Sequence, residues 1–385
     1  MFLRKFLVCG SLIAAIQAFT YIIQTSSTRD IDYYMNQYDA QFNAFRASKK
    51  ANTFRSFNVG NITGFMGDFD DELLGLLYND SSILEISAEK YLKLDAVQTQ
   101  EFSSRHLLRL THKNLIYDNQ PELLYDASAG IGVDVAIIDS GVNGKHCEFT
   151  GRVKRIFDFV NEAGIDDPIG HGTALAGVVG SETYGVAKKC NIVDIKVASR
   201  DRVAKLSDVI SALNLVVSQS KETKRPTVIL LAMSISRSKL LDSIVQKIVD
   251  QGIPVITSAG NDGRLACSNS PSSASGSLSV GSIDDATNKI AGFSNWGACI
   301  DIFSSGVDVT TTGNTGNTAT KASGTSVSAG IVAGLTAYYM GTGKSGFEAV
   351  QMIKQVSTDG IIEGLLLKPY TQNKIAHLDS SGSSL

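Results

Sequence analysis

The 385-residue chain is poor in proline, nearly balanced in charge and has only one long apolar run. Six prolines beside 35 glycines, with no repeat, exclude both collagen and a Pro-rich disordered chain. The net charge is −3 and no basic run occurs, so we expect no nucleic-acid partner. Neither Cys-x-x-Cys nor His-x-x-x-His spacing is present, which argues against a catalytic zinc. The length allows two or three domains.

The one long apolar run lies at the N-terminus. Arg4 and Lys5 precede it, and Ala18 is a small residue suited to the position before a cleavage. This pattern predicts a secretory signal peptide over residues 1–18 and therefore a secreted protein. The run is short for a membrane span, although an uncleaved anchor helix is the alternative interpretation.

The sequence pattern of residues 20–94 indicates one small α+β unit. Strand and helix patterns follow in the order strand, helix, strand, strand, helix, strand, with the segments at 20–24, 31–45, 54–59, 64–69, 70–77 and 83–94. This order predicts a split βαβ, or ferredoxin-like, arrangement. We find no convincing catalytic cluster in it. Triplets at Asn61 and Asn79 fit the glycan acceptor pattern, and the sequence leaves their occupancy open.

From about residue 96 onward, short apolar runs alternate with helical stretches. The runs lie at 133–139, 192–197, 228–233, 254–258 and 278–282. Apolar strands separated by helices predict an α/β fold with a mostly parallel sheet covered by helices on both faces. We expect this domain to extend over residues 96–378 and a flexible Ser/Gly-rich tail to follow at 379–385.

Two candidate catalytic residues belong to the first half of this domain. Asp139 ends an apolar run that is expected to be a strand. The reactive groups of parallel sheets lie at the carboxyl ends of their strands, and a carboxylate at such a position could orient an imidazole. His171 lies between Gly170 and Gly172 at the start of a helix of small residues, which would hold a general base rigidly. Taken singly, a capping aspartate and an ordinary helix-start histidine explain them equally well.

Two further candidates lie nearer the C-terminus. Ser326 is the last residue of a Ser-Gly-Thr-Ser segment that precedes an apolar helix, so its hydroxyl and its free backbone N–H would lie at a helix N-terminus. Such an N–H can bind an oxyanion, and the side-chain amide of Asn261, which follows another apolar run, can do the same. Taken singly, these residues read as a helix cap and a turn asparagine.

The combination carries far more information than its parts. Asp139, His171 in Gly-His-Gly-Thr, Asn261 in Ser-Ala-Gly-Asn and Ser326 in Ser-Gly-Thr-Ser occur in the chain order known from subtilisin. The chain therefore resembles the subtilisin family of serine peptidases. It is most similar to the proteinase K branch, through segments at 147–152, 183–189 and 294–306, and the resemblance covers roughly residues 96–345. Residues 20–94 resemble the inhibitory propeptide of that family, with residues 65–71 matching its usual stretch.

The resemblance implies a serine endopeptidase that acts through an acyl-enzyme. Asp139 would orient the base, His171 would transfer the proton, Ser326 would attack the scissile carbonyl, and Asn261 with the Ser326 N–H would hold the oxyanion. No cofactor is needed for this catalysis. The implied partners are polypeptide substrates and the chain's own propeptide, and we expect a monomer.

The resemblance also implies maturation. Residues 19–95 would act as an intramolecular chaperone and inhibitor, cut off near residues 95–97, so the protein would be a self-processing proenzyme. The alternative is a catalytically silent binding protein with the subtilisin fold that retains its propeptide. That alternative is worth testing because residues 174–177 and 327–330 depart from the family pattern. Gly330 replaces a proline and is expected to loosen a helix turn, but neither departure removes a reacting group.

The family pattern also places the substrate-binding segments. These are expected at Arg202, Val203 and Ala204 on one edge, at Ser234, Ile235 and Ser236 on the opposite edge, and at Ser258, Ala259 and Gly260. Ser236 stands where glycine is common and is expected to narrow the first specificity pocket. Arg202 is expected to favour acidic or polar groups a few residues before the cut.

Four cysteines remain once Cys9 leaves with the signal peptide. The resemblance implies a disulfide between Cys267 and Cys299. Cys147 and Cys190 then either pair or stay as free thiols, and the sequence leaves both alternatives open. The resemblance also allows a structural calcium at Asp284, with carbonyls near residues 275 and 277, although a surface-turn aspartate explains that residue equally well.

Overall fold

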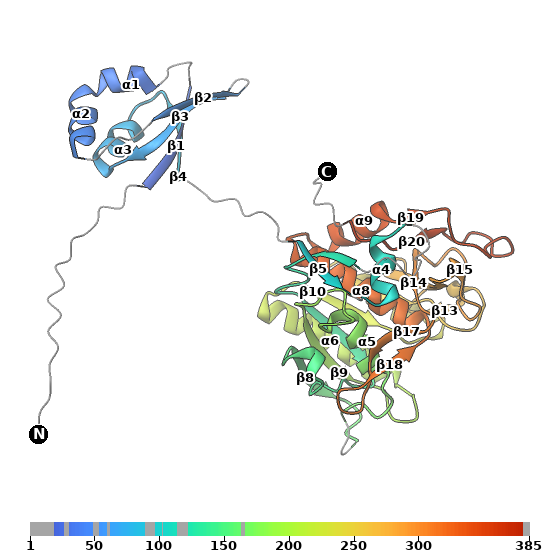
Figure 1. Ribbon diagram of the computed structural model, residues 1–385. Coiled ribbons are helices and arrows are strands. Elements are labelled where there is room, and N and C mark those ends of the chain that lie inside the picture. The colour runs from blue at the N-terminus through green and yellow to red at the C-terminus, as the bar shows by residue number, and fades with distance from the viewer. Residues whose placement is uncertain are drawn as a thin grey trace, which may run out of the picture. The chain divides into compact units, whose positions relative to one another are not determined.

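The computed structural model describes residues 19–26, 31–48, 54–59, 62–88, 97–101, 103–113, 122–162 and 166–379. The chain divides into two compact units, Met1–Leu94 and Asp95–Leu385 (Figure 1). The expected signal peptide, Asn61, residues 95–96 at the expected cleavage point and all but the first residue of the expected tail lie outside the described residues.

The N-terminal unit is a four-stranded antiparallel sheet with helices. The strands pair in the order β2-β3-β1-β4, as the split βαβ arrangement requires. The single helix expected over residues 31–45 is divided into two helices, with Tyr38 between them. Asp70 caps the third helix of the unit, because its carboxylate accepts a hydrogen bond from the Leu73 amide (2.9 Å). The elements are β1 (Phe19–Thr25), α1 (Ile31–Gln37), α2 (Asp39–Ser48), β2 (Arg55–Val59), β3 (Ile62–Phe69), α3 (Asp71–Tyr78) and β4 (Ile83–Ala88).

The second unit is built on a ten-stranded sheet, mostly parallel, as its apolar runs predict. The strands follow the order β19-β20-β16-β14-β12-β10-β7-β9-β8, with β15 paired to β14. Only β15 and β19 run antiparallel to their neighbours in the sheet. The strands are β7 (Asp134–Asp139), β8 (Val153–Asp158), β9 (Asn191–Lys196), β10 (Thr227–Leu231), β12 (Val255–Ser258), β14 (Leu278–Asp284), β15 (Lys289–Ile290), β16 (Ile302–Ser305), β19 (Thr358–Asp359) and β20 (Lys374–Ile375).

Helices cover both faces of this sheet, which confirms the expected fold class. On one face, α5 (His171–Gly180) and α8 (Thr325–Gly341) pack on a core that includes Val135, Ile137 and Val280. On the other face, α6 (Leu206–Thr223) and α7 (Lys239–Val249) pack on Ala136, Ile138 and Ile229. Successive residues of β7 thus contribute their side chains to opposite cores, as the two-residue period of a strand requires. The helices α4 (Arg105–Thr111) and α9 (Gly346–Val356) complete the unit.

The strand order explains where a site can form. From β7 the chain passes to β8 and β9 on one side of it, and then to β10, β12 and β14 on the other side. Loops that leave the carboxyl ends of such strands diverge, and a crevice opens between them. Asp139 ends β7 at this point, and α5 and α8 begin with His171 and Thr325.

The structure gives Gly330 a different role from the one expected. The helix α8 continues through Gly330 from Thr325 to Gly341 without interruption. A Cβ atom at Gly330 would lie 2.7 Å from a methyl carbon of Val178 on α5, which is closer than side-chain contacts allow. Glycine at this position therefore lets α8 and α5 pack closely, and α8 shows no break at the turn that was expected to loosen.

Short paired strands and a disulfide secure the surrounding loops. The pairs are β5 (Val97–Glu101) with β6 (Glu122–Asp126), β11 (Ile235–Ser236) with β13 (Asn269–Ser270), and β17 (Val309–Thr312) with β18 (Ala319–Ala322). The expected disulfide between Cys267 and Cys299 is present. Cys147 and Cys190 are free thiols, because Cys147 is exposed on the short 3-10 helix Cys147–Phe149 whereas Cys190 is enclosed in the core. Within the described part of the chain, we find no helix that has the length and apolar character to cross a membrane.

Candidate active site

Asp139 and His171 form a hydrogen-bonded pair. The Nδ1 atom of His171 lies 2.8 Å from Oδ1 of Asp139, and the Ser140 amide donates to the same oxygen at 2.7 Å. The aspartate is buried, whereas more than a third of the imidazole is exposed. A carboxylate on Nδ1 fixes the tautomer with its proton on that nitrogen and leaves Nε2 as an acceptor.

The close approach of two backbone segments makes this pair possible. The first turn of α5 packs against the loop that follows Asp139. A Cβ atom on Gly172 would collide with the Gly141 carbonyl oxygen and lie 3.3 Å from the Asp139 Cβ. Glycine at position 172 is therefore the reason that α5 comes near enough for His171 to reach Asp139.

A second buried carboxylate, that of Asp167, holds the loops on both sides of the pair. It accepts hydrogen bonds from the Ser140 hydroxyl (2.8 Å), the Gly170 amide (2.8 Å) and both the amide and the hydroxyl of Thr173 (2.8 and 2.6 Å). The Ser140 hydroxyl in turn accepts from the Gly172 amide (3.0 Å). Asp167 therefore connects the loop after Asp139 to the first turn of the helix that carries His171.

The charges around His171 set its basicity. The carboxylate of Asp139 is the largest influence and raises the pKa of His171 above its ordinary value. Burial lowers this pKa, the hydrogen bond to Asp139 and the charge of Asp167 raise it, and the charge of Arg202 lowers it. The imidazole is thus a stronger base than a free histidine.

This raised pKa predicts a pH dependence. A general base must be neutral to accept a proton, so activity should be lost as the pH falls through the pKa of His171. Because that pKa is raised, we expect the acid limb of kcat/KM to have its midpoint above about pH 6.5, the ordinary imidazole value. A pH profile of kcat/KM on a peptide without titrating groups checks this. A midpoint well below 6.5 would contradict the assignment of His171 as the base.

Ser326 lies at the N-terminus of α8, as the sequence predicts. Its hydroxyl donates to the Ala232 carbonyl at 3.2 Å. Its backbone N–H has no acceptor among the described residues, because the first helical amide bonds come from Val327 and Ser328, both to Gly324. This N–H is therefore available to an anion in the cleft.

Thr325 orients the side chain of Asn261. The Oδ1 atom of Asn261 accepts two hydrogen bonds from Thr325, one from its amide and one from its hydroxyl, both 2.8 Å long. With the oxygen held in this way, the amide NH₂ group is the part of Asn261 that remains free to donate. Two donors, Asn261 Nδ2 and the Ser326 N–H, are thus anchored to the same turn before α8.

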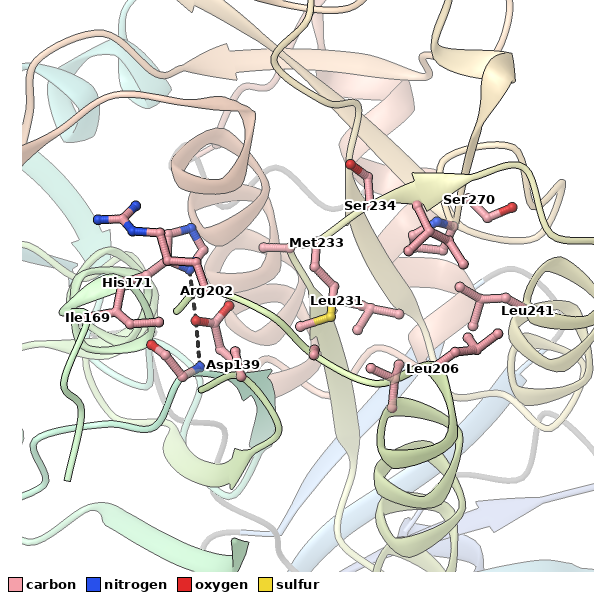
Figure 2. A pocket seen from close by; sticks show the side chains of 17 residues that line it. Asp139, Ile169, His171, Arg202, Leu206, Leu231, Met233, Ser234, Leu241 and Ser270 are labelled. Atoms are coloured by element: carbon pink, nitrogen blue, oxygen red, sulfur yellow. Dashed lines mark hydrogen bonds and ion pairs between the residues drawn. The ribbon is translucent and has the colours of Figure 1, made fainter. Parts of the chain in front are cut away.

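His171, Asn261 and Ser326 line one cleft, together with Arg202, strand β18 and the turn that precedes it. An adjoining pocket shares His171 and Arg202 and contains Asp139. In Figure 2, His171 and Arg202 lie at one end of this pocket, and Leu206, Leu231 and Leu241 lie toward the other end. The structure thus brings together four predicted residues from four separate parts of the chain.

Comparison with known proteins identifies the family. The sequence profile of the subtilase family matches residues 130–374. Alkaline protease 1 of Aspergillus clavatus is 34% identical over 328 residues, covering 84% of this chain and 79% of that protein. The alkaline serine protease ver112 of Corniculantispora psalliotae is 32% identical and covers 85% of each chain. The chain belongs to the subtilase family.

The fold comparison agrees with this result. The crystal structure of a cold-adapted subtilisin-like serine proteinase superposes with a TM-score of 0.65 at 30% identity, covering 72% of this chain and 98% of that one. The subtilase is therefore a serine-type endopeptidase that acts on polypeptides. Catalysis in this family needs no cofactor, because a serine, a histidine and an aspartate carry out the chemistry.

Only some of the other residues predicted to bind substrate line a described pocket of the subtilase. Ala204, Ser234 and Ile235 line the pocket of Figure 2. Val203 and Ser236 are exposed and do not line it, so a narrowing of the first specificity pocket by Ser236 stays a prediction. Ser258, Ala259 and Gly260 are buried and line neither cleft described above, and the Gly260 amide donates to the Thr325 hydroxyl (3.1 Å).

Asp284 does not fit a calcium site well in this subtilase. Its Oδ1 accepts from the Ala286 amide (3.0 Å) and its Oδ2 from the Thr287 hydroxyl (3.1 Å), so both oxygens serve the turn before β15. Within the described residues, no group of three or more His, Cys, Asp or Glu side chains gathers as metal ligands. These contacts match the surface-turn alternative. The carbonyls expected near residues 275 and 277 precede the first residue of β14, whereas Asp284 is its last, so they lie at opposite ends of the strand and the expected calcium site does not form.

Sequence reasoning missed three supporting residues of the site, namely Ser140, Asp167 and Thr325. The sequence positions of two of them could have indicated a role in the site. Asp167 lies in the short loop before a helix start, where an aspartate side chain often accepts hydrogen bonds from nearby backbone amides. Thr325 stands directly before the candidate nucleophile. Nothing in the sequence indicates that the Thr325 hydroxyl reaches Asn261.

Proposed function

We propose that the chain is a secreted serine endopeptidase in which Ser326 is the nucleophile and His171, held by Asp139, is the general base. The observation that carries this proposal is the 2.8 Å contact of His171 with Asp139 beside a cleft that Ser326 and Asn261 also line. The three side chains belong to β7, α5 and α8, rigid elements that meet at the point where the strand order reverses.

The reaction begins with a rotation of the Ser326 side chain. Its hydroxyl leaves the Ala232 carbonyl and turns toward Nε2 of His171, which takes the proton as the oxygen attacks the scissile carbonyl. The tetrahedral oxyanion is stabilised by Asn261 Nδ2 and the Ser326 N–H. His171 then gives the proton to the leaving amine, which releases the C-terminal product and leaves an ester on Ser326. Water, activated by His171, hydrolyses this ester.

The substrate is proposed to lie as an extended strand between two edges. Arg202, Val203 and Ala204 form one edge, and Ser234, Ile235 and Ser236 form the other. Ala204 belongs to a bridge with Ala198, and β11 is paired with β13 on its far side, so both edges are held by the enzyme itself. An extended peptide needs such backbone partners on each side.

Maturation is proposed to follow the family pattern. Residues 1–18 direct secretion, and residues 19–95 form a propeptide that assists folding and inhibits the enzyme until it is cut near residues 95–97. The N-terminal unit supports this role because it has a core of its own, made of Ile23, Tyr34, Phe42, Phe65 and neighbouring side chains. It can therefore fold as a unit before it is removed.

A fluorophosphonate probe tests the proposed nucleophile. Such probes react only with a serine that has been activated by a neighbouring base. We expect covalent labelling of the mature protein at Ser326, located by mass spectrometry of a digest. The competing interpretation, a silent binding protein that keeps its propeptide, predicts no labelling. Labelling at a serine other than Ser326 would overturn the assignment.

A further inference from the structure

Arg202 is presented to the cleft by a tight loop between β9 and α6. The loop is closed by the bridge between Ala198 and Ala204 and by two backbone hydrogen bonds, from the Ser199 amide to Val203 (3.0 Å) and from the Arg202 amide to Ser199 (2.9 Å). Arg202 has a φ of 63°, which few non-glycine residues adopt. The loop thus holds Arg202 in one place, where its side chain lines both parts of the cleft.

The guanidinium of Arg202 has no partner in the part of the chain that the structure describes. Among the described residues, no carboxylate lies within the 4.0 Å of an ion pair, and no hydrogen bond occupies the side chain. By contrast, Arg155 is paired with Asp194 (2.7 Å) and Arg225 with Asp134 (2.9 Å). Arg202 is therefore a cation in the cleft whose donors are all available to a ligand.

Arg202 differs in charge from the other residues that line the pocket of Figure 2. Leu206, Leu231 and Leu241 give the far end an apolar lining (Figure 2). Asp139 is the one carboxylate among the lining residues, and it is already bonded to His171 and to the Ser140 amide. Among the described residues that line this pocket, Arg202 therefore carries the one charge that no protein group pairs, and that charge is positive. Lys321 adds a second cation in the adjoining cleft.

From this arrangement, and resting on the function proposed above, we propose that Arg202 is a specificity-determining residue that selects substrates with a glutamate or aspartate on the N-terminal side of the scissile bond. The carboxylate of the substrate would form a charge-assisted, two-point contact with the guanidinium, which is a geometry that Arg favours. The aliphatic part of the neighbouring substrate residues would pack on the leucines.

Binding such a carboxylate would also favour the chemistry. The charges that act on His171 are those of Asp139 and Asp167, which raise its pKa, and that of Arg202, which lowers it. A substrate carboxylate on Arg202 neutralises the lowering influence, so the imidazole becomes a better base when the preferred substrate is bound. Recognition of the acid and activation of the base are therefore coupled through one side chain.

Matched peptides test the proposal. Peptides that differ only in Glu against Gln are compared at each of the four positions before the cut, using the mature enzyme at low ionic strength. We expect kcat/KM to be about ten-fold higher for Glu at one of these positions, which is the size of a charge-assisted contact. The Glu-to-Gln ratio should fall toward one in Arg202→Ala and below one in Arg202→Glu. High salt should also reduce it.

Arg200→Ala is the control variant. Arg200 lies in the same loop, is exposed and lines neither pocket, so the variant removes the same charge from a nearby place. We expect it to keep both the Glu preference and the acid limb of the pH profile. Arg202→Ala should instead move the acid limb on the Gln peptide to higher pH, because the cation that lowers the pKa of His171 is gone.

The outcomes separate this proposal from the underlying function. A ratio near one in the wild type, or an equal loss of ratio in Arg200→Ala and Arg202→Ala, overturns the role of Arg202 while hydrolysis itself continues. Failure to hydrolyse any peptide, together with no fluorophosphonate labelling, would instead refute the proposed protease function.

Discussion

Replacing Ser326 with alanine is expected to stop maturation and to abolish peptide hydrolysis. The variant lacks the oxygen that would form the ester, so the secreted protein should begin near residue 19, whereas the wild type should begin near Ala96. In the related enzyme subtilisin, loss of the nucleophile lowers kcat by about 10⁶, and we carry that figure over. N-terminal sequencing and a peptide assay of both secreted proteins measure the two effects.

Ser328→Ala is the matched control for this experiment. Ser328 lies on the same helix, and its hydroxyl donates to the carbonyls of Ser304 and Ser305 (3.2 and 3.0 Å) rather than to the cleft. Its loss should cost about 1 kcal/mol of stability, but the protein should still mature. If Ser326→Ala were processed normally in a host without other proteases, self-processing at this site would be refuted.

The buried strands could be predicted from the sequence because each is an apolar run. The segments expected at 133–139, 192–197 and 254–258 lie within one or two residues of β7, β9 and β12. Strand β8 was missed because it lies at an edge of the sheet. Its three charged residues, Lys154, Arg155 and Asp158, make the segment Val153–Asp158 resemble a solvated loop.

The sequence likewise predicted some residues of the site and not others. Motif order pointed to Asp139, His171, Asn261 and Ser326, but not to the carboxylate of Asp167. Asp167 acts through contacts with Ser140 and Thr173 that depend on how α5 packs against the loop after β7. The sequence likewise suggested an acid preference for Arg202, but only the structure shows that its guanidinium lacks a partner among the described residues and that it lines the same cleft as His171.

Asp139→Asn is the prediction that probes the hydrogen bond between base and carboxylate. An amide cannot stabilise the imidazolium that forms during attack, and it permits the wrong tautomer of His171. We therefore expect kcat to fall by about 10⁴, the loss seen in serine proteases with this change. The acid limb of kcat/KM should also move to lower pH, since the Asp139 charge is the largest influence that raises the pKa of His171.

These two readouts separate a catalytic role from a structural one. A variant that merely unfolded would lose activity without moving the pH midpoint of the remaining activity. Asp262→Asn supplies the control, because Asp262 is half-exposed next to Asn261 and, within the described residues, forms an ion pair with Arg264 alone (3.2 Å). It removes one negative charge near the cleft but leaves the contact between Asp139 and His171 intact. A full rate in Asp139→Asn, or an acid limb that moved to higher pH, would show that this carboxylate does not support the base.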